Sequence, residues 1–418
     1  MTTLLAVFVH DGFYGCGTGA GVANRAFLEA LTQITTDLNL DLDLVILPIE
    51  ISTDSAEYDP AWHTQSLQLV ERAGGRVVPL DNGTGRTTRW GGLPAFRAAA
   101  EHAARTLLDL LPGPSSDGGP RLLVAHDVPF YGLATMLPPE LVADLVLVAH
   151  STAGIHCPDD RDRVDWETQG LHHTAKLGGR IAAISDHMRN HLVRDYGLPD
   201  ESVIDLPIGL SPADWARPIP ADPALPPAAR EGFWLAMGRA VPYKGADDLL
   251  DSLHILRDTT GTRPPHLVLA AVTDSGQLTD YQRQLADRIE AEHLDVTLIT
   301  RFSQDLQNLL THPALRAVVV PSRAEPFGRI PLEAYAAGAA PVVATTAGGL
   351  AELVIDGHTG FTAAPDDPAS LAAALCRAQQ QTREELDAMR NRARQIARRY
   401  DTRSSLLRFM SQNLMDVL

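Results

Sequence analysis

Lysine and cysteine are both scarce in this chain of 418 residues. Of its 35 basic residues only Lys176 and Lys244 are lysines. A lysine that stands beside other candidate binding residues therefore indicates a specific role in binding. The cysteines Cys16, Cys157 and Cys376 are odd in number and far apart, which argues against a disulfide framework and against a zinc cluster. So few cysteines fit a reducing cytoplasm.

A membrane signal and an excess of positive charge are lacking as well. No apolar run approaches the roughly 20 residues that a membrane span needs. Residues 1–10 lack the basic region and the cleavage site of a signal peptide and are expected to form a first strand. The formal net charge of -17 argues against nucleic acid and anionic membranes as general partners. The protein is therefore expected to be cytoplasmic, without a membrane span, and to act as a monomer or a homodimer.

Apolar runs of strand length alternate with helical patterns through both halves of the chain. This alternation predicts α/β domains, each with a parallel sheet between helices. The length exceeds what one hydrophobic core usually serves, so two domains are expected. The strands are expected at residues 4–9, 42–47, 76–79, 122–125, 145–149, 181–184, 233–237, 267–272, 296–300, 317–320 and 341–344.

A proline-rich stretch separates the two halves. Residues 213–230 hold too many prolines for a helix interior or a central strand and are predicted to form a hinge. The expected domains are therefore residues 1–212 and residues 231–394. Residues 395–418 are first basic and then amphipathic, which predicts a C-terminal helix.

Two glutamates, Glu325 and Glu333, stand eight residues apart behind the predicted strand 317–320. The first falls in a loop that continues Pro-Phe-Gly and the second falls one turn into a helix, so both carboxylates are expected to face one cleft. A carboxylate suits the hydroxyls of a ribose or of another sugar, which donate hydrogen bonds to it. The alternative is the acid and nucleophile of a glycoside hydrolase, but that pair leaves the basic loop described next unexplained.

A basic loop follows the first predicted strand of the second domain. It reads Gly-Arg-Ala-Val-Pro-Tyr-Lys-Gly from Gly238 to Gly245 and leads into a predicted helix. The fork of Arg239 and the point charge of Lys244 suit phosphate oxygens, and a helix N-terminus favours an anion. The loop therefore predicts a diphosphate site, the alternative being a surface ion pair.

A glycine-rich loop, residues 11–21, follows the first predicted strand of the chain. Its glycines, among them Gly17 and Gly19, let backbone N–H groups approach a ligand at the start of a helix. A flexible turn is the alternative. The spacing does not match the dinucleotide-binding fingerprint, so a dinucleotide ligand is not favoured.

Polar residues follow two of the predicted middle strands directly. His126 and Asp127 come after residues 122–125, and His150 comes after residues 145–149. Ligands of α/β sheets bind at the carboxyl ends of strands, so these residues are candidates for contact with a ligand. A structural role is the alternative for each histidine.

Two other polar segments are predicted to be mainly structural. Residues 81–92 include Arg86 and Arg89; a solvated loop is favoured there, with an acceptor site as the alternative. Residues 156–176 are rich in His, Asp and Glu, but their spacing fits no standard metal-ligand pattern. An exposed loop that leads into a helix is favoured for this segment.

On these residues the chain resembles the retaining nucleotide-sugar glycosyltransferases of glycosyltransferase family 4, which have the GT-B fold. The resemblance rests on the E-x7-E spacing of Glu325 and Glu333 and on the G-R-x4-K-G spacing of residues 238–245. It covers the chain as a whole, and its specific motifs lie within residues 238–361. It implies two Rossmann-like parallel-sheet domains facing a cleft, the first for the acceptor and the second for the nucleotide sugar. It also implies that the last helix crosses back onto the N-terminal domain.

The resemblance implies roles for individual residues, with His150 and Glu325 against the donor sugar and Glu333 on the ribose. The implied catalytic residues are His150, Arg239, Lys244 and Glu325. The implied nucleotide-sugar ligands are Gly17, Gly19, Gly238, Arg239, Lys244, Arg301, Glu325, Phe327, Gly328, Arg329 and Glu333. The candidates for acceptor contact are Arg86, Arg89, His126 and Asp127.

The expected activity is transfer of a sugar from a nucleotide-diphosphate sugar to a soluble small-molecule acceptor, with retention of anomeric configuration, as in specialised-metabolite or antibiotic biosynthesis. No cofactor and no metal are expected, because Arg239, Lys244 and a helix N-terminus meet the charge of the leaving group. No D-x-D sequence follows a strand in a suitable place either. Two alternatives stay open: an epimerase or phosphorylase of the same fold, and a non-catalytic nucleotide-sugar-binding protein.

Overall fold

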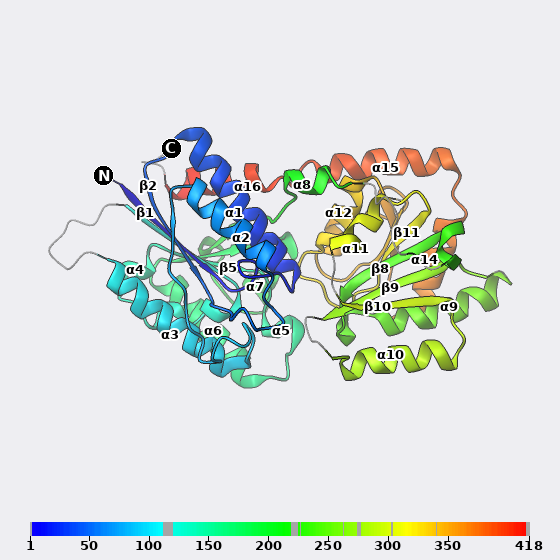
Figure 1. Cartoon of the computed structure of the whole chain (residues 1–418), viewed down its shortest axis with the longest axis horizontal. Helices are drawn as coiled ribbons and strands as arrows, with labels where there is room; N and C mark the ends of the chain where they lie inside the picture. The colour runs from blue at the N-terminus through cyan, green and yellow to red at the C-terminus, as the bar shows by residue number, and fades with distance from the viewer. Residues whose placement is uncertain are drawn as a thin grey trace. The chain divides into compact units, whose positions relative to one another are not determined.

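Two parallel sheets organise the chain, one in each of two units (Figure 1). Unit 1 comprises Met1–Ser211 and Thr402–Leu418, and unit 2 comprises Pro212–Asp401. The computed structural model describes residues 2–111, 120–218, 225, 227–261, 263–273, 277–301, 304–339 and 341–414. The predicted α/β architecture, with two Rossmann-like domains, is confirmed.

Unit 1 contains a seven-stranded sheet in the order β3-β2-β1-β4-β5-β6-β7. Its strands are β1 (Thr3–Val9), β2 (Leu42–Pro48), β3 (Arg76–Val77), β4 (Arg121–His126), β5 (Leu145–Ala149), β6 (Arg180–Ala183) and β7 (Val203–Asp205). All five residues of β5 are buried, as the central strand of a parallel sheet requires when helices cover both faces. The register pairs Val9 of β1 with His126 of β4, which aligns the carboxyl ends of these strands.

The helices of unit 1 are α1 (Gly19–Leu38), α2 (Pro60–Arg72), α3 (Gly92–Leu110), α4 (Pro139–Val142), α5 (Ala153–His156), α6 (Arg161–Lys176), α7 (Asp186–Arg194) and α16 (Thr402–Asn413). Short 3-10 turns span Val128–Phe130, Leu133–Thr135 and Asp200–Ser202. The C-terminal helix α16 packs against α1, so the last residues of the chain belong to the N-terminal unit.

Unit 2 contains a six-stranded sheet in the order β10-β9-β8-β11-β12-β13. Its strands are β8 (Phe233–Arg239), β9 (His266–Thr273), β10 (Val296–Arg301), β11 (Leu315–Val320), β12 (Val342–Thr345) and β13 (Gly360–Ala363). Its helices are α8 (Pro212–Trp215), α9 (Ala246–Thr260), α10 (Asp280–Ala291), α11 (Gln304–Asn308), α12 (Arg329–Ala337), α13 (Leu350–Leu353), α14 (Pro368–Gln379) and α15 (Arg383–Ala397), with 3-10 turns at Pro227–Glu231, Pro242–Lys244 and Leu309–Thr311. Leucines of α9 and α14 form one buried cluster with β9 and β11, which holds these helices on the sheet.

Two predicted segments differ from the structure. The hinge 213–230 begins within a helix, α8, because a proline in the first turn of a helix gives up no hydrogen bond. Residues 219–224 and 226 of that hinge lie outside the described residues. The predicted C-terminal helix 395–418 is interrupted, since α15 and α16 are separate helices and the division between the units falls between them.

Two short strands, β7 and β13, were missed. Their sequences, Val-Ile-Asp and Gly-Phe-Thr-Ala, contain no uninterrupted apolar run of the kind by which the similarly short β12 was recognised. None of the described helices combines the length and the apolar character that crossing a bilayer requires.

Candidate active site

The basic loop of unit 2 joins β8 to α9. The turn Pro242–Lys244 brings Lys244 to the start of this 15-residue helix. Gly245 has a φ of +68°, and a Cβ there would lie 2.0 Å from the carbonyl oxygen of Pro321, so only glycine fits. The loop therefore presents a cation beside the first amides of a helix, an arrangement that favours an anionic ligand.

Lys244 lies against Glu325. Its Nζ is 2.5 Å from Oε2 of Glu325, and the two side chains are 19% and 14% exposed. The loop of Glu325 is held in place because its carbonyl accepts a hydrogen bond from Gly349 at 2.9 Å. Phe327 anchors the same loop against the ring of Tyr400, with centroids 5.7 Å apart. The structure thus brings together the predicted diphosphate and sugar ligands, which stand 81 residues apart in the chain.

Tyr243 lies between the two cations of the basic loop and was not singled out by the sequence. Nη2 of Arg239 donates a hydrogen bond to the Tyr243 hydroxyl. The charged ends of Arg239 and Lys244 each lie 5.7 Å from the centre of the Tyr243 ring. An aromatic face attracts cations, so Tyr243 orients both side chains. An aromatic residue between Arg and Lys in one loop is the signal that points to this role.

Glu333 is buried in α12, with only 3% of its surface exposed. Its Oε1 accepts a hydrogen bond at 2.8 Å from Nε of Arg329, one turn earlier. Arg329 is itself buried, and its Nη2 lies 2.5 Å from Oδ2 of Asp214. Arg329 therefore contacts carboxylates of the protein, and its direct contact with a nucleotide stays a prediction.

Three further residues of unit 2, Gly238, Gly328 and Arg301, were predicted to bind the nucleotide sugar, and each lies on a different loop or strand end. Gly238 lies under Lys244, whose Cγ would be 3.6 Å from a Cβ at that position. Gly328 precedes α12 with a φ of +97°, and a Cβ there would lie 2.5 Å from Cδ2 of Leu350. Gly328 is therefore required for the close approach of its loop to Leu350, whereas a Cβ at position 238 would make only an ordinary contact with Lys244. Arg301 ends the edge strand β10, which β9 separates from β8.

Three histidines stand at the carboxyl ends of three adjacent strands of unit 1. His10 follows β1, His126 ends β4 and His150 follows β5. Nδ1 of His126 lies 3.2 Å from Nε2 of His150, and Nδ1 of His10 lies 3.6 Å from Oδ2 of Asp127. The structure therefore unites His126, Asp127 and His150 in one cluster. Sequence reasoning missed His10, although it occupies the same strand-end position as the other two histidines.

Burial determines the charge of this cluster. It lowers the pKa of both His126 and His150 below the ordinary value, which favours neutral imidazoles. Burial alone would raise the pKa of Asp127, but His10, 3.6 Å away, and the nearby His150 hold this pKa at about 2. Nε2 of His126, Nδ1 of His150 and Oδ1 of Asp127 are buried and have no hydrogen-bond partner among the described residues. Such atoms often mark a functional site.

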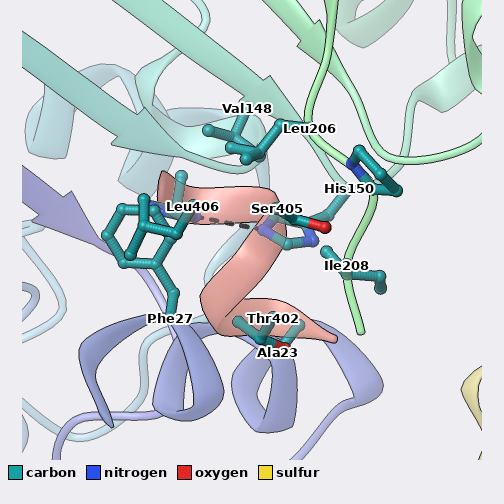
Figure 2. A pocket seen from close by; sticks show the side chains of 11 residues that line it. Ala23, Phe27, Val148, His150, Leu206, Ile208, Thr402, Ser405 and Leu406 are labelled. Atoms are coloured by element: carbon teal, nitrogen blue, oxygen red, sulfur yellow. Dashed lines mark hydrogen bonds between the residues drawn. The ribbon is translucent and has the colours of Figure 1, made fainter. Parts of the chain in front are cut away.

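A small cavity adjoins the two histidines (Figure 2). Its volume is about 20 Å³, and it is lined by His126, His150, α1, α16 and residues 206–208. One water needs a cavity of roughly 10–15 Å³, so this cavity has room for one water but not for a sugar. Phe27 of α1 and Ser405 of α16 lie on its walls, which places the C-terminal helix beside the cluster.

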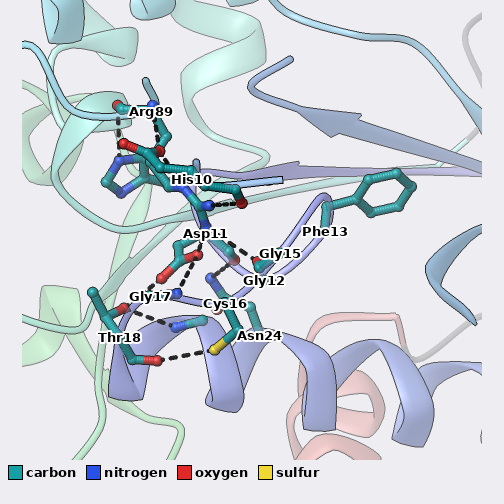
Figure 3. A network of polar contacts seen from close by, with 12 residues as sticks. His10, Asp11, Gly12, Phe13, Gly15, Cys16, Gly17, Thr18, Asn24 and Arg89 are labelled. Atoms are coloured by element: carbon teal, nitrogen blue, oxygen red, sulfur yellow. Dashed lines mark hydrogen bonds and ion pairs between the residues drawn. The ribbon is translucent and has the colours of Figure 1, made fainter. Parts of the chain in front are cut away.

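The glycine-rich loop of unit 1 is organised by Asp11 (Figure 3). Oδ2 of Asp11 accepts a hydrogen bond from Thr18, the N-cap of α1, at 2.6 Å, and Oδ1 accepts from Gly17 N–H at 3.4 Å. The N–H of Gly17 is therefore already used within the loop. A Cβ on Gly19, the first residue of α1, would meet nothing within 4 Å, so this end of the helix is open.

Arg89 is the cation of the same network. Most residues of its loop, 81–92, are exposed as predicted, but Arg89 itself is buried. Only 2% of its side chain is exposed. Its guanidinium pairs with Asp11 and, through Nε at 2.8 Å, with Glu57. Arg89 thus joins three loops, whereas Arg86 is exposed and pairs with Glu50 at 3.0 Å. Direct contact of either arginine with an acceptor stays a prediction.

The segment 156–176 is more helical and more buried than its composition suggests. Most of it forms α6 (Arg161–Lys176), and Glu167 is fully buried, with Oε2 accepting the N–H of Ala153 at 2.7 Å. Within the part of the chain that the structure describes, no group of three or more His, Cys, Asp or Glu side chains is placed to hold a metal ion.

Two solved structures share the overall fold of this chain. A UDP-glucose complex of the Anabaena protein Alr3699/HepE matches with a TM-score of 0.65 and 19% identity, covering 99% of both chains. The sucrose-phosphate synthase of Thermosynechococcus elongatus matches with a TM-score of 0.70 and 18% identity, covering 100% of this chain and 99% of that one. At such identities the similarity concerns the fold, which is GT-B.

Sequence comparison identifies relatives of the chain. Residues 222–396 match the family described as Glycosyl transferases group 1. The D-inositol 3-phosphate glycosyltransferase of Frankia alni (strain DSM 45986 / CECT 9034 / ACN14a) is 34% identical over 206 residues, which cover 47% of this chain and 49% of that protein. The glycogen synthase of Mycobacterium tuberculosis (strain ATCC 25618 / H37Rv) is 30% identical over 327 residues, which cover 76% of this chain and 74% of that protein. The chain therefore belongs to the group 1 glycosyltransferases, enzymes of the GT-B fold.

Proposed function

We propose that this glycosyltransferase moves a sugar from a nucleoside-diphosphate sugar to a small hydroxyl-bearing acceptor with retention of configuration, as the retaining enzymes of family 4 do. The observation that carries the proposal is the contact of Lys244 with Glu325, 2.5 Å apart at the start of α9, with Arg239 in the same loop. A cation suits a diphosphate and a carboxylate suits a sugar hydroxyl. Their direct contact fits a ligand that carries both groups, as a nucleotide sugar does.

Cleavage of the bond between sugar and diphosphate leaves negative charge on the diphosphate. Arg239 and Lys244 are proposed to stabilise this charge together with the first N–H groups of α9. Because these groups supply positive charge, the reaction is proposed to need no metal ion. Glu325 is proposed to hold a hydroxyl of the transferred sugar, and Glu333 a hydroxyl of the nucleotide ribose.

The acceptor is proposed to be an uncharged, soluble small molecule, of the kind found among specialised metabolites, bound by unit 1. A phosphorylated acceptor needs positive charge. Arg89 is paired with two carboxylates, Asp11 and Glu57, and Arg86 with one, so neither group carries a net positive charge. The basic loop of unit 2 differs, because it carries two cations, Arg239 and Lys244, and among the described residues one carboxylate, that of Glu325, pairs with them. His126 and Asp127 offer groups that suit hydroxyls, and they are proposed as acceptor ligands. The contact of His150 with the donor sugar remains a prediction.

The donor and the acceptor are tested in two assays. Calorimetric titration with UDP-, GDP-, ADP- and dTDP-glucose identifies the nucleotide. Release of nucleoside diphosphate is then measured with glucose, myo-inositol, D-inositol 3-phosphate and a short glucan, the last two chosen from the names of the relatives. We expect release that depends on an uncharged acceptor, and NMR should show that the product keeps the anomeric configuration of the donor.

Variants test the site itself. We expect Lys244→Met to lower kcat/KM about 10²- to 10³-fold, as loss of one charge-stabilising group does. Glu325→Gln should lower it about 10- to 100-fold, because the hydrogen bond from the sugar hydroxyl loses its charged acceptor. Arg377→Met, which alters an exposed ion pair with Asp356 in the same unit, is the matched control and should keep wild-type kcat/KM. Full activity in both site variants would refute the assignment. Epimerised sugar without acceptor, a requirement for inorganic phosphate, or donor binding without turnover would instead identify an epimerase, a phosphorylase or a binding protein.

A further inference from the structure

Four charged side chains form a buried cluster around Glu333 within unit 2. Asp214 and Arg217 come from α8 and the residues just after it, and Arg329 and Glu333 come from the start of α12. The side chains are 4–9% exposed. Asp214 binds both arginines, with Oδ2 2.5 Å from Nη2 of Arg329 and Oδ1 2.6 Å from Nη2 of Arg217. The cluster is neutral in sum, with two cations and two anions.

Stability alone does not explain this cluster. Removing charges from water costs free energy that ion pairing only partly returns, so hydrophobic side chains of the same size often serve a fold as well. Arg329 also stands in the first turn of α12, where the helix dipole disfavours a cation. The position is favourable only through its carboxylate partners, which points to a role in placing Glu333.

The two oxygens of Glu333 have different surroundings. Oε1 accepts a hydrogen bond from Nε of Arg329 at 2.8 Å. Among the described residues Oε2 lies 3.8 Å from Nη2 of Arg217, which is beyond hydrogen-bond distance. Burial raises the pKa of Glu333, and the charge of Arg329 opposes that rise. Arg329 therefore fixes one oxygen and favours the ionised carboxylate, which leaves Oε2 able to accept a hydrogen bond from a ligand.

We propose that Asp214 and Arg329 are positioning residues for nucleotide recognition, holding Glu333 so that Oε2 accepts a hydrogen bond from the ribose 2′-hydroxyl. Asp214 orients the guanidinium of Arg329, and Arg329 orients Glu333. The inference rests on the proposed function, in which Glu333 binds the ribose. It adds that the segment at the start of unit 2 determines how strongly that ribose is bound.

The test compares ribonucleotides with their 2′-deoxy counterparts. UDP, GDP and ADP are titrated by calorimetry against dUDP, dGDP and dADP, with wild type, Asp214→Asn, Arg329→Met and the double variant D214N/R329M. The double variant removes one cation and one anion and nearly keeps the side-chain volumes. The cluster therefore stays neutral, with Arg217 and Glu333, 3.8 Å apart, as its remaining ion pair. The matched control, D356N/R377M, makes the same chemical changes in an exposed ion pair of the same unit.

Wild type and the control should prefer one ribonucleotide over its deoxy counterpart about 10- to 100-fold, the effect of a hydrogen bond to a charged group. In D214N/R329M this preference should fall to about twofold or less, because affinity for the ribonucleotide drops while affinity for the deoxynucleotide hardly changes. A double variant that keeps the wild-type preference, or that binds both nucleotides more weakly by equal factors, would overturn the inference. A wild type that binds a ribonucleotide and its deoxy counterpart equally well would overturn the inference, because Glu333 would then not bind the 2′-hydroxyl. A wild type that binds none of the six nucleotides and none of the four nucleotide sugars would instead count against the proposed function itself.

Discussion

Replacing Arg89 by Met should destabilise unit 1 selectively. Arg89 joins the loops that follow β1 and β2 to its own loop, through Asp11 and Glu57. Its nitrogens also donate to the carbonyl oxygens of Gly15 at 3.1 Å and Glu57 at 2.7 Å. Methionine has a similar length but no charge and no donors, so the substitution tests the interactions rather than the volume.

The magnitude follows from what the substitution leaves behind. The side chain of Asp11 is 1% exposed, whereas that of Glu57 is 12% exposed and keeps some contact with water. Without Arg89, the carboxylate of Asp11 retains the Thr18 hydroxyl and a long contact from Gly17. An uncompensated buried charge costs about 3–5 kcal/mol. The double variant D11N/R89M removes both charges and should recover at least about half of this loss.

Hydrogen exchange measured by mass spectrometry gives the local unfolding free energies of the two units separately. In Arg89→Met, amides of β1 and α1 should lose about 3–5 kcal/mol of protection, while amides of β8 and α9 keep theirs. The control is Arg86→Met in the same loop, where the side chain is 57% exposed and the expected loss is below about 1 kcal/mol. A loss below about 1 kcal/mol in Arg89→Met, or an equal loss in unit 2, would refute the reasoning.

Two further predictions concern pH and backbone conformation. Because burial lowers the pKa of His126 and His150, the unfolded chain binds protons that the folded chain does not as pH falls below about 6.5. The unfolding free energy of unit 1 should therefore be constant above pH ~7.5 and fall between pH ~6.5 and ~5. Denaturant titrations at a series of pH values should show a smaller fall in His126→Gln. The same dependence of unfolding free energy on pH in wild type and variant would contradict this. Gly245→Ala should destabilise unit 2 by more than about 2 kcal/mol, because the alanine would adopt a strained left-handed conformation and its Cβ would clash with Pro321. The control is Gly261→Ala, where φ is +67° but a Cβ would meet nothing within 4 Å. This variant should lose only about 1–2 kcal/mol from the left-handed strain alone. Equal losses in thermal unfolding of the two glycine variants would contradict the predicted clash.

Local patterns were enough to predict that both units are α/β domains with parallel sheets. Runs such as Leu145–Ala149 are apolar without interruption because both faces of a parallel strand are covered, and this property is visible without coordinates. The strand before Lys244 and the helix after it were likewise predicted from local patterns, an apolar run and a helical period. The strands β7 and β13 were missed because their short sequences mix apolar residues with polar residues or glycine and so contain no uninterrupted apolar run.

By itself the sequence determined the class of fold, the basic loop and the pair of glutamates, since each depends on residues that are neighbours in the chain. Only the tertiary structure decided that His10 joins the other strand-end histidines. The reason is that β1 pairs not only with β2, the next strand in the chain, but also with the distant strand β4. Likewise it decided that Arg89 is buried against Asp11 and that Asp214 reaches Arg329, 115 residues away. A charged side chain has the same identity whether it is solvated or buried. Its role depends on which distant segment supplies its partner, and folding alone determines that partner.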